Sequence, residues 1–179
     1  MSNTKILNTI PVGEIFKIGD TEFIKFSDEN GVTTAVCKDI VFSSTFGNNN
    51  NFAESNIIKR LTKEFLPEIE SIIGAENVLE FETDLLSLDG SDKHGVMKSK
   101  ISIPTFDFYR RNRSVFEKHK LNKWWWLATP DSTGEYYNDN WCVCVSPVGY
   151  LDNFDNFNYD VGVRPFCNFV SSISVSYNE

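Results

Sequence analysis

The chain has 179 residues, of which 41% are hydrophobic and 14% aromatic, and its formal net charge is −8. This length and ring content are typical of one domain with a sizeable core, and they exclude an intrinsically disordered chain. No run approaches the ~20 apolar residues that span a bilayer, and residues 1–16 lack the apolar stretch of a signal peptide. We therefore expect a cytoplasmic protein with one domain over 1–179, no membrane binding and four reduced cysteines. The oligomeric state stays open.

The negative charge is concentrated near the carboxy terminus. From Asp131 onward, seven acidic residues stand against Arg164 alone, so this segment carries −6 and the first 130 residues carry only −2. An acidic surface repels the phosphates of DNA and RNA. We therefore expect no direct nucleic-acid binding and favour a protein partner, for which a basic surface would be complementary.

The amino-terminal part, 1–47, predicts strands. Ile15–Ile18, Thr21–Ser27 and Thr33–Cys37 are rich in β-branched and aromatic residues, and glycine-containing turns separate them. This pattern indicates two tight hairpins of an antiparallel sheet.

The middle part, 51–113, predicts helices and a loop. Asn51 and Glu54 have the spacing of a capping box, which predicts a helix start near Phe52. Pro67 fits the first turn of a second short helix, and Gly74 fits its end.

The remainder of this middle part is less regular. The polar, glycine-punctuated region Glu80–Lys100 predicts a long surface loop. Thr105 can cap a third short helix over Phe106–Arg113.

The last part, 124–170, predicts short strands at Trp141–Ser146, Gly149–Phe154 and Val161–Phe169. The whole pattern indicates an α+β fold with antiparallel sheets, two to three short helices and long loops.

Two segments of this last part also carry a resemblance. Trp124-Trp125-Trp126-Leu127-Ala128-Thr129-Pro130, with Gly162-Val163-Arg164-Pro165 further on, resembles an uncharacterised domain family of Gram-positive bacteria and their phages. That family is similar to the C-type-lectin-like fold of formylglycine-generating enzymes. The resemblance implies a C-type-lectin-like fold with lectin-like core strands over 124–170, but no agreed activity.

Five residues are predicted to be structural. The resemblance implies this role for Gly162 and Arg164, which would lie on a core strand. Each tryptophan ring buries roughly 150–250 Å² when packed, so the triple tryptophan is expected to anchor the core, with Trp125 nearest the surface. The predicted structural residues are Trp124, Trp125, Trp126, Gly162 and Arg164.

The resemblance also implies an exposed binding face, around Tyr136–Asn140 and Tyr150–Asp160. In this region aromatic rings alternate with Asn and Asp, a composition typical of protein-binding surfaces. The predicted binding residues are Tyr136, Tyr137, Tyr150, Asp152, Phe154, Asp155, Asn156, Phe157, Asn158 and Tyr159.

No candidate for catalysis is complete. Cys142 and Cys144 lack a second Cys or His pair for zinc and match no active-site motif of the formylglycine-generating enzymes. His94 follows Asp89 and Asp92 in the predicted loop, a proximity expected by chance in so acidic a chain. We therefore predict no enzyme activity, no cofactor and no metal site.

Three functions remain in order of preference. The first is a non-catalytic binding module of phage or mobile-element origin that recognises a protein or a glycan. The alternative is an acidic inhibitor of a host nucleic-acid enzyme, such as an anti-CRISPR acting on a CRISPR nuclease. The third, a metal oxidase like the formylglycine-generating enzymes, requires a bound metal.

Overall fold

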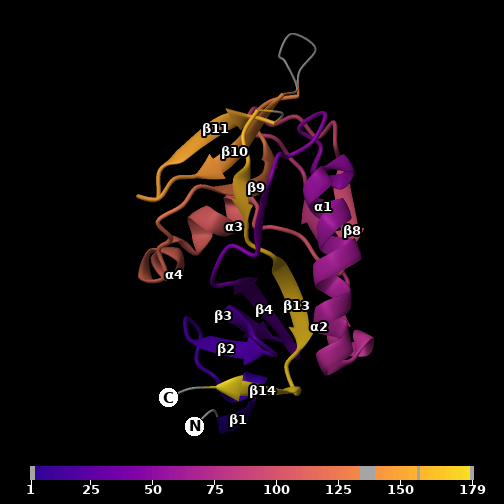
Figure 1. The fold of residues 1–179 in the computed structure, drawn as a ribbon, viewed down its shortest axis with the longest axis vertical. Helices are drawn as coiled ribbons and strands as arrows, with labels where there is room; N and C mark the ends of the chain where they lie inside the picture. Colours follow the sequence, from indigo (N-terminus) through magenta and orange to yellow (C-terminus); the bar gives the residue numbers. More distant parts are fainter. Residues whose placement is uncertain (1–2, 134–139, 157, 178–179) are drawn as a thin grey trace.

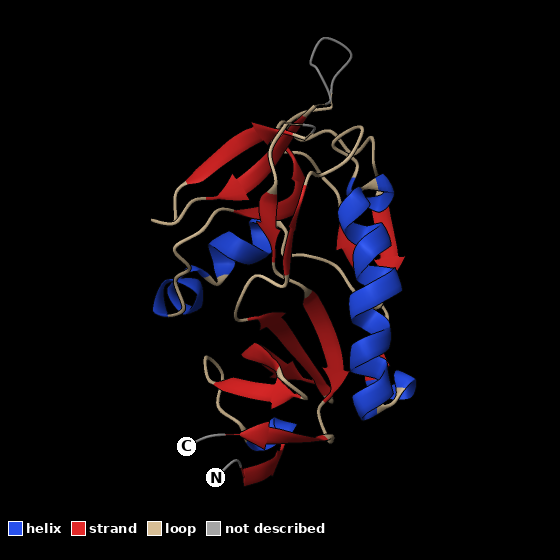
Figure 2. Cartoon of the chain, viewed as in Figure 1, coloured by secondary structure: helices blue, strands red, loops and turns tan. Residues whose placement is uncertain are grey.

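The structure is a computed structural model that describes residues 3–133, 140–156 and 158–177. Two larger sheets lie end to end, and helices flank them (Figure 1; Figure 2). One sheet has seven strands and is curled into a half-barrel, the second has five, and a third consists of two strands. The prediction of a mixed α+β fold with mostly antiparallel sheets is therefore confirmed.

The seven-stranded sheet contains the first and the last strand and has the order β1-β14-β2-β3-β4-β13-β6. The three predicted amino-terminal strands are confirmed, and Asn30 and Gly31 form the β3–β4 turn with φ angles of 52° and 80°. Both angles suit the turn that joins twisted antiparallel strands. The strands are β1 (Asn3–Ile6), β2 (Ile15–Ile18), β3 (Thr21–Glu29), β4 (Val32–Cys37), β6 (Val78–Leu79), β13 (Phe166–Val170) and β14 (Ser174–Tyr177).

The five-stranded sheet has the order β11-β10-β9-β12-β5. Its β9–β12 pair is parallel, with Gly162 opposite Trp125, and its other pairs are antiparallel. The β10–β11 turn closes where the Gly149 backbone N–H donates to the Ser146 carbonyl at 2.9 Å. The strands are β5 (Phe42–Ser44), β9 (Trp125–Pro130), β10 (Trp141–Val145), β11 (Leu151–Asp155) and β12 (Val161–Val163).

One long helix replaces the two predicted helices. α1 (Asn56–Arg60), a π turn (Leu61–Phe65) and α2 (Leu66–Ile73) follow each other without a break. Proline lacks an N–H and crowds the carbonyl four residues before it. In the π turn before Pro67, the Leu66 N–H reaches back five residues to the Leu61 carbonyl, so the helix continues.

The helix predicted to start near Phe52 is there only a 3₁₀ turn, and the long helix begins at Asn56. Asn51 caps a 3₁₀ turn over Phe52–Glu54, in which its side chain accepts from the Ala53 N–H. Ser55 then caps α1 by accepting from the Ile58 N–H at 3.1 Å. The capping-box spacing marks the short turn rather than the long helix.

The loop predicted over 80–100 is wrong as well. It contains β7 (Phe81–Asp84) and β8 (Val96–Ser99), which form the two-stranded sheet. The helix predicted over Phe106–Arg113 is present as α3 (Phe106–Arg111), with Thr105 as its cap. The helix that follows it, α4 (Arg113–Lys118), was not predicted. The β7–β8 hairpin was not predicted because its strands are short and mostly polar.

Two hydrophobic clusters hold these elements together. The larger one joins both large sheets to the long helix, through residues such as Phe23, Phe65 and Trp126. The smaller one joins the five-stranded sheet to α3, α4 and strands β3 and β4, and includes Trp125, Phe116 and Phe26. Within the described residues, no helix combines the length and apolar character needed to cross a membrane.

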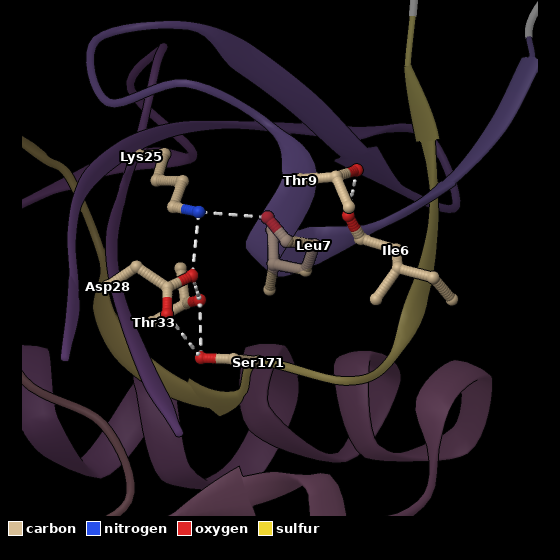
Figure 3. Close-up of polar contacts among 7 residues, drawn as sticks. All are labelled: Ile6, Leu7, Thr9, Lys25, Asp28, Thr33 and Ser171. Carbon is tan, nitrogen blue, oxygen red and sulfur yellow. Dashed lines mark hydrogen bonds and ion pairs between the residues drawn. The ribbon is translucent and has the colours of Figure 1, made fainter. Parts of the chain in front are cut away.

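A buried polar network anchors the amino-terminal segment (Figure 3). The Lys25 side chain is only 1% exposed, and its Nζ donates to the Leu7 carbonyl at 2.9 Å and to Asp28 Oδ2 at 2.7 Å. Thr33 and Ser171 donate to the two Asp28 oxygens at 2.9 and 3.0 Å. The Asp28 carboxylate therefore connects β3, β4 and the turn after β13 to the buried ammonium, which also holds the 3₁₀ turn at Leu7.

We predict that Asp28→Asn costs about 3 kcal/mol of unfolding free energy, because it leaves the buried Lys25 cation without its counter-ion. Urea unfolding measures this cost. The exposed neighbour Glu29 is the matched control, and Glu29→Gln should change stability by less than about 0.5 kcal/mol.

The same network predicts an acid dependence. Burial raises the pKa of Asp28, but the hydrogen bonds from Lys25, Thr33 and Ser171 outweigh it, so this pKa lies below its ordinary value. The ionised carboxylate therefore stabilises the fold above the unfolded-state pKa, and this stability is lost as the pH falls through the folded-state pKa. Equal acid sensitivity of the wild type and Asp28→Asn would contradict this role.

Candidate binding edge

A chain of aromatic rings runs from the core to the surface beside β11. The Phe154 ring lies 4.7 Å from Trp124, 6.4 Å from the buried Trp126 and 5.0 Å from Tyr159, measured between ring centroids. Tyr159 is 52% exposed. The outermost ring is therefore supported by packed rings rather than by a free loop.

Further large side chains are exposed on the hairpin that β10 and β11 form. Tyr150 is 71% exposed, Trp141 41% and Leu151 39%. Asp152 and Asp160, also exposed, form no ion pair with any Lys or Arg among the described residues. We call this surface the β11 edge, and its residues are Trp141, Tyr150, Leu151, Asp152, Tyr159 and Asp160.

The β11 edge presents side chains on both sides of one strand. Register pairs Leu151 with Val145 and Asp155 with Trp141, so Leu151 and Trp141 lie on one side of the sheet. Asp152 and Phe154 lie on the other side. The exposed surface predicted from the sequence is thus a strand edge rather than a loop face, because residues 151–155 belong to β11.

The backbone along this edge is partly capped. The Ser146 N–H donates to the Tyr150 carbonyl at 2.8 Å, so the polar groups of Leu151 and Asn153 point away from β10. The Asn153 N–H is taken by the Asp152 carboxylate at 2.9 Å. An acidic residue that occupies an edge donor disfavours the addition of another strand. The β11 edge therefore offers its side chains rather than its backbone.

The predicted binding residues do not all lie on this edge. Tyr136, Tyr137 and Phe157 lie outside the described residues. Asn158 is exposed, and Asp155 is half-buried.

Asn156 is fully buried, so its prediction as an exposed binding residue is wrong. Its N–H donates to the Asn140 carbonyl at 2.8 Å, and its carbonyl accepts from the Phe46 N–H at 3.0 Å. These bonds hold it under the loop that follows β5. Neither polar atom of its side chain has a hydrogen-bond partner among the described residues.

The three tryptophans divide between the two clusters. Trp125 packs on Phe116 with a ring distance of 5.4 Å, and Trp126 packs on Phe46 at 5.5 Å. Alternation along β9 sends these two rings to opposite faces of a sheet that is covered on both sides. The expectation that Trp125 lies nearest the surface is wrong, because Trp125 is buried and Trp124 is the half-exposed ring.

Gly162 lies where the chain passes closest to β9. A Cβ atom on it would meet Ile40 Cδ1 at 2.2 Å and the Trp124 carbonyl oxygen at 2.8 Å. The Gly162 N–H donates to that same carbonyl at 3.0 Å. Glycine is required here by space.

The cysteine and histidine side chains that were considered for catalysis or metal binding are held in other roles. Burial raises the pKa of the Cys142 thiol well above its ordinary value and that of Cys144 to about 12, so both thiols stay protonated at neutral pH. The His94 ring nitrogen Nε2 lies 2.9 Å from the buried Asn50 side-chain oxygen. The described part of the chain holds no group of three His, Cys, Asp or Glu side chains suited to a metal.

Comparisons with protein-family models, curated proteins and solved structures gave no match to this chain.

Two edge residues were missed from the sequence. Trp141 looks like an ordinary member of β10, whose other residues are buried, and Leu151 looks like an ordinary apolar residue of β11. They are exposed because they lie at opposite ends of the β10–β11 pair. Only the strand register, which joins Trp141 to Asp155 at one end and Val145 to Leu151 at the other, reveals this position.

We predict that Gly162→Ala destabilises the protein by about 1–3 kcal/mol through overpacking. Truncation of Ile40 removes the nearest atoms but leaves the Trp124 carbonyl in place. In an Ile40→Ala background the glycine substitution should therefore cost less, though not zero. Thermal unfolding of the four proteins in this cycle measures the coupling, and additive effects would contradict the close approach.

Proposed function

We propose that this protein is a non-catalytic binding module that captures a protein through the β11 edge. The observation that carries the proposal is the set of exposed Trp141, Tyr150 and Leu151 side chains on the β10–β11 hairpin, together with the exposed Tyr159. The Tyr159 ring packs on Phe154. Aromatic side chains dominate the energetic centres of protein interfaces. Rings held by neighbours also lose little conformational freedom on binding.

Charge supports a partner with a basic surface. Asp152 and Asp160 are exposed and follow Leu151 and Tyr159 directly in the chain, and the segment from Asp131 onward carries −6. Complementary charge around an apolar centre raises association rates and excludes acidic partners. Nucleic acids are disfavoured for the same reason.

The proposal also includes a C-type-lectin-like fold and membership of the phage-associated family. Support comes from the pairing of the two segments that carry the resemblance, since Gly162 lies opposite Trp125 in adjacent strands. The cytoplasm is the proposed compartment, and the four buried cysteines without disulfides support it.

A second candidate function is inhibition of a host nucleic-acid enzyme. It is favoured by the exposed carboxylates of Asp152 and Asp160, which can occupy a basic channel in place of phosphates. Such inhibition should weaken steeply with salt and with the double reversal Asp152→Lys and Asp160→Lys. Inhibition that is indifferent to both would contradict this candidate.

The proposed function predicts that the double variant Tyr150→Ser and Tyr159→Ser loses partner capture by at least tenfold, because each ring removed is an exposed anchor. Affinity capture from host lysate with protein identification measures this loss. Unfolding free energy should change by less than about 1 kcal/mol, since surface substitutions cost within about 0.5 kcal/mol each.

The matched control is the double variant Val12→Ser and Ile72→Ser, which removes exposed apolar side chains on other elements. It should capture the same protein as the wild type. Equal losses in both double variants would contradict the assignment to the β11 edge, and glycan capture without any protein would contradict the protein partner.

A further inference from the structure

A second strand edge, on β7, differs from the β11 edge in being uncapped. The Leu85 N–H donates to the Gly95 carbonyl at 3.0 Å, which fixes the hydrogen-bonded positions of the β7–β8 hairpin. By alternation, the N–H and C=O groups of Glu82 and Asp84 point away from β8. Among the described residues, no partner accepts or donates to these groups.

This edge borders a cleft of about 500 Å³. β7 lines one side and α3 lines the other, with β13 also contributing. Three phenylalanine rings give the cleft an apolar lining, since Phe166 lies 5.0 Å from Phe81 and 4.9 Å from Phe108 between centroids. A second cleft of about 240 Å³ adjoins it through the shared residues Asp84, Thr105 and Asp107.

The cleft lies where the chain leaves β13 after β6. Leu79 of β6 pairs with Asn168 of β13, but the chain then departs from β13, and Ser102 bridges to Phe166 instead. β7 thus follows β6 in the chain but does not pair with β13 as β6 does, so its edge away from β8 has no partner strand among the described residues. The buried Thr83 hydroxyl, which lines the cleft, also lacks a hydrogen-bond partner.

The charges around the cleft are uneven. Glu82, Asp84 and Asp107 line it against Arg111 alone, a balance of −2. Glu82 and Asp84 are exposed, and both side chains lie on one face of the β7–β8 sheet. Asp107 is already paired with Arg110 at 2.9 Å. A strand added to β7 would therefore face two carboxylates on its solvent side.

We propose that the β7 edge is a docking site for an extended peptide that joins the β7–β8 sheet as a third strand. The four residues of β7 set the length of the paired segment at about four residues. Cross-strand pairing favours Lys or Arg opposite Glu82 and Asp84. The alternate side chains, which point to the other face, meet the phenylalanine rings and are apolar. The partner is thus a segment of alternating basic and apolar residues.

The test uses a fluorescein-labelled hexapeptide of alternating lysine and valine with blocked ends, titrated with the full-length protein and followed by fluorescence anisotropy. Binding is expected at micromolar to millimolar concentrations. The hexapeptide with three consecutive lysines followed by three valines should bind at least tenfold more weakly. Absence of binding by the alternating peptide would overturn the proposal.

Backbone methylation tests strand addition directly. A strand pairs through the N–H groups of alternate residues, so methylation of one alternate set should weaken binding at least tenfold and methylation of the other set should not. Equal effects of the two sets would overturn the proposal. The amide protons of Glu82 and Asp84 should exchange more slowly with solvent in the bound state.

The charge-reversed variant Glu82→Lys and Asp84→Lys should bind the alternating peptide at least tenfold more weakly. The matched control is Glu68→Lys and Glu76→Lys, which reverses two exposed carboxylates outside the cleft. Equal affinities of the two double variants for the alternating peptide would overturn the proposed pairing of its lysines with Glu82 and Asp84. Because the β11 edge is a separate surface, failure of the peptide to bind leaves the proposed function standing.

Discussion

Arg164 is a buried cation that joins the two large sheets. Its Nε donates to the Cys37 carbonyl and its Nη2 to the Lys38 carbonyl, both at 3.0 Å. The guanidinium lies 4.9 Å from the Trp125 ring centroid and 5.3 Å from that of Phe116. Burial lowers its pKa to about 10, so the group remains charged at neutral pH.

The arrangement around Arg164 fixes one geometry. Burying a charge costs several kcal/mol, and carbonyl oxygens together with ring faces must offset that cost. The carbonyls come from the end of β4, and the rings come from β9 and α4. A shift of one sheet relative to the other would separate the cation from one set of partners. The buried charge thus restricts how the sheets can sit.

The β11 edge depends on this restriction through adjacent strands. Arg164 follows β12, and β12 lies against β9. β9 pairs with β10, and β10 pairs with β11. Gly162 allows β12 to approach Ile40 and the β9 backbone closely. A hairpin held in this way can present its rings in one orientation, which lowers the entropic cost of binding.

Local signals predicted those parts of the fold that local interactions determine. The Asn30-Gly31 turn and the Thr105 cap are visible in the sequence because their geometry needs particular residues. Pro67 led to the wrong prediction of a helix boundary, because the π turn that accommodates it depends on packing of the long helix. The exposure of Trp141 depends on strand register, and the burial of Trp125 depends on coverage by α4. Neither is encoded within a few neighbouring residues.

The central claim is that the β11 edge touches the partner. Replacement of Tyr150 by a photo-crosslinking phenylalanine analogue in living host cells tests it most directly, with the same replacement at the exposed Val12 as the reference. The account predicts one dominant covalent adduct from position 150 and none of that mass from position 12. Adducts of the same protein from position 12 but not from position 150 would contradict it.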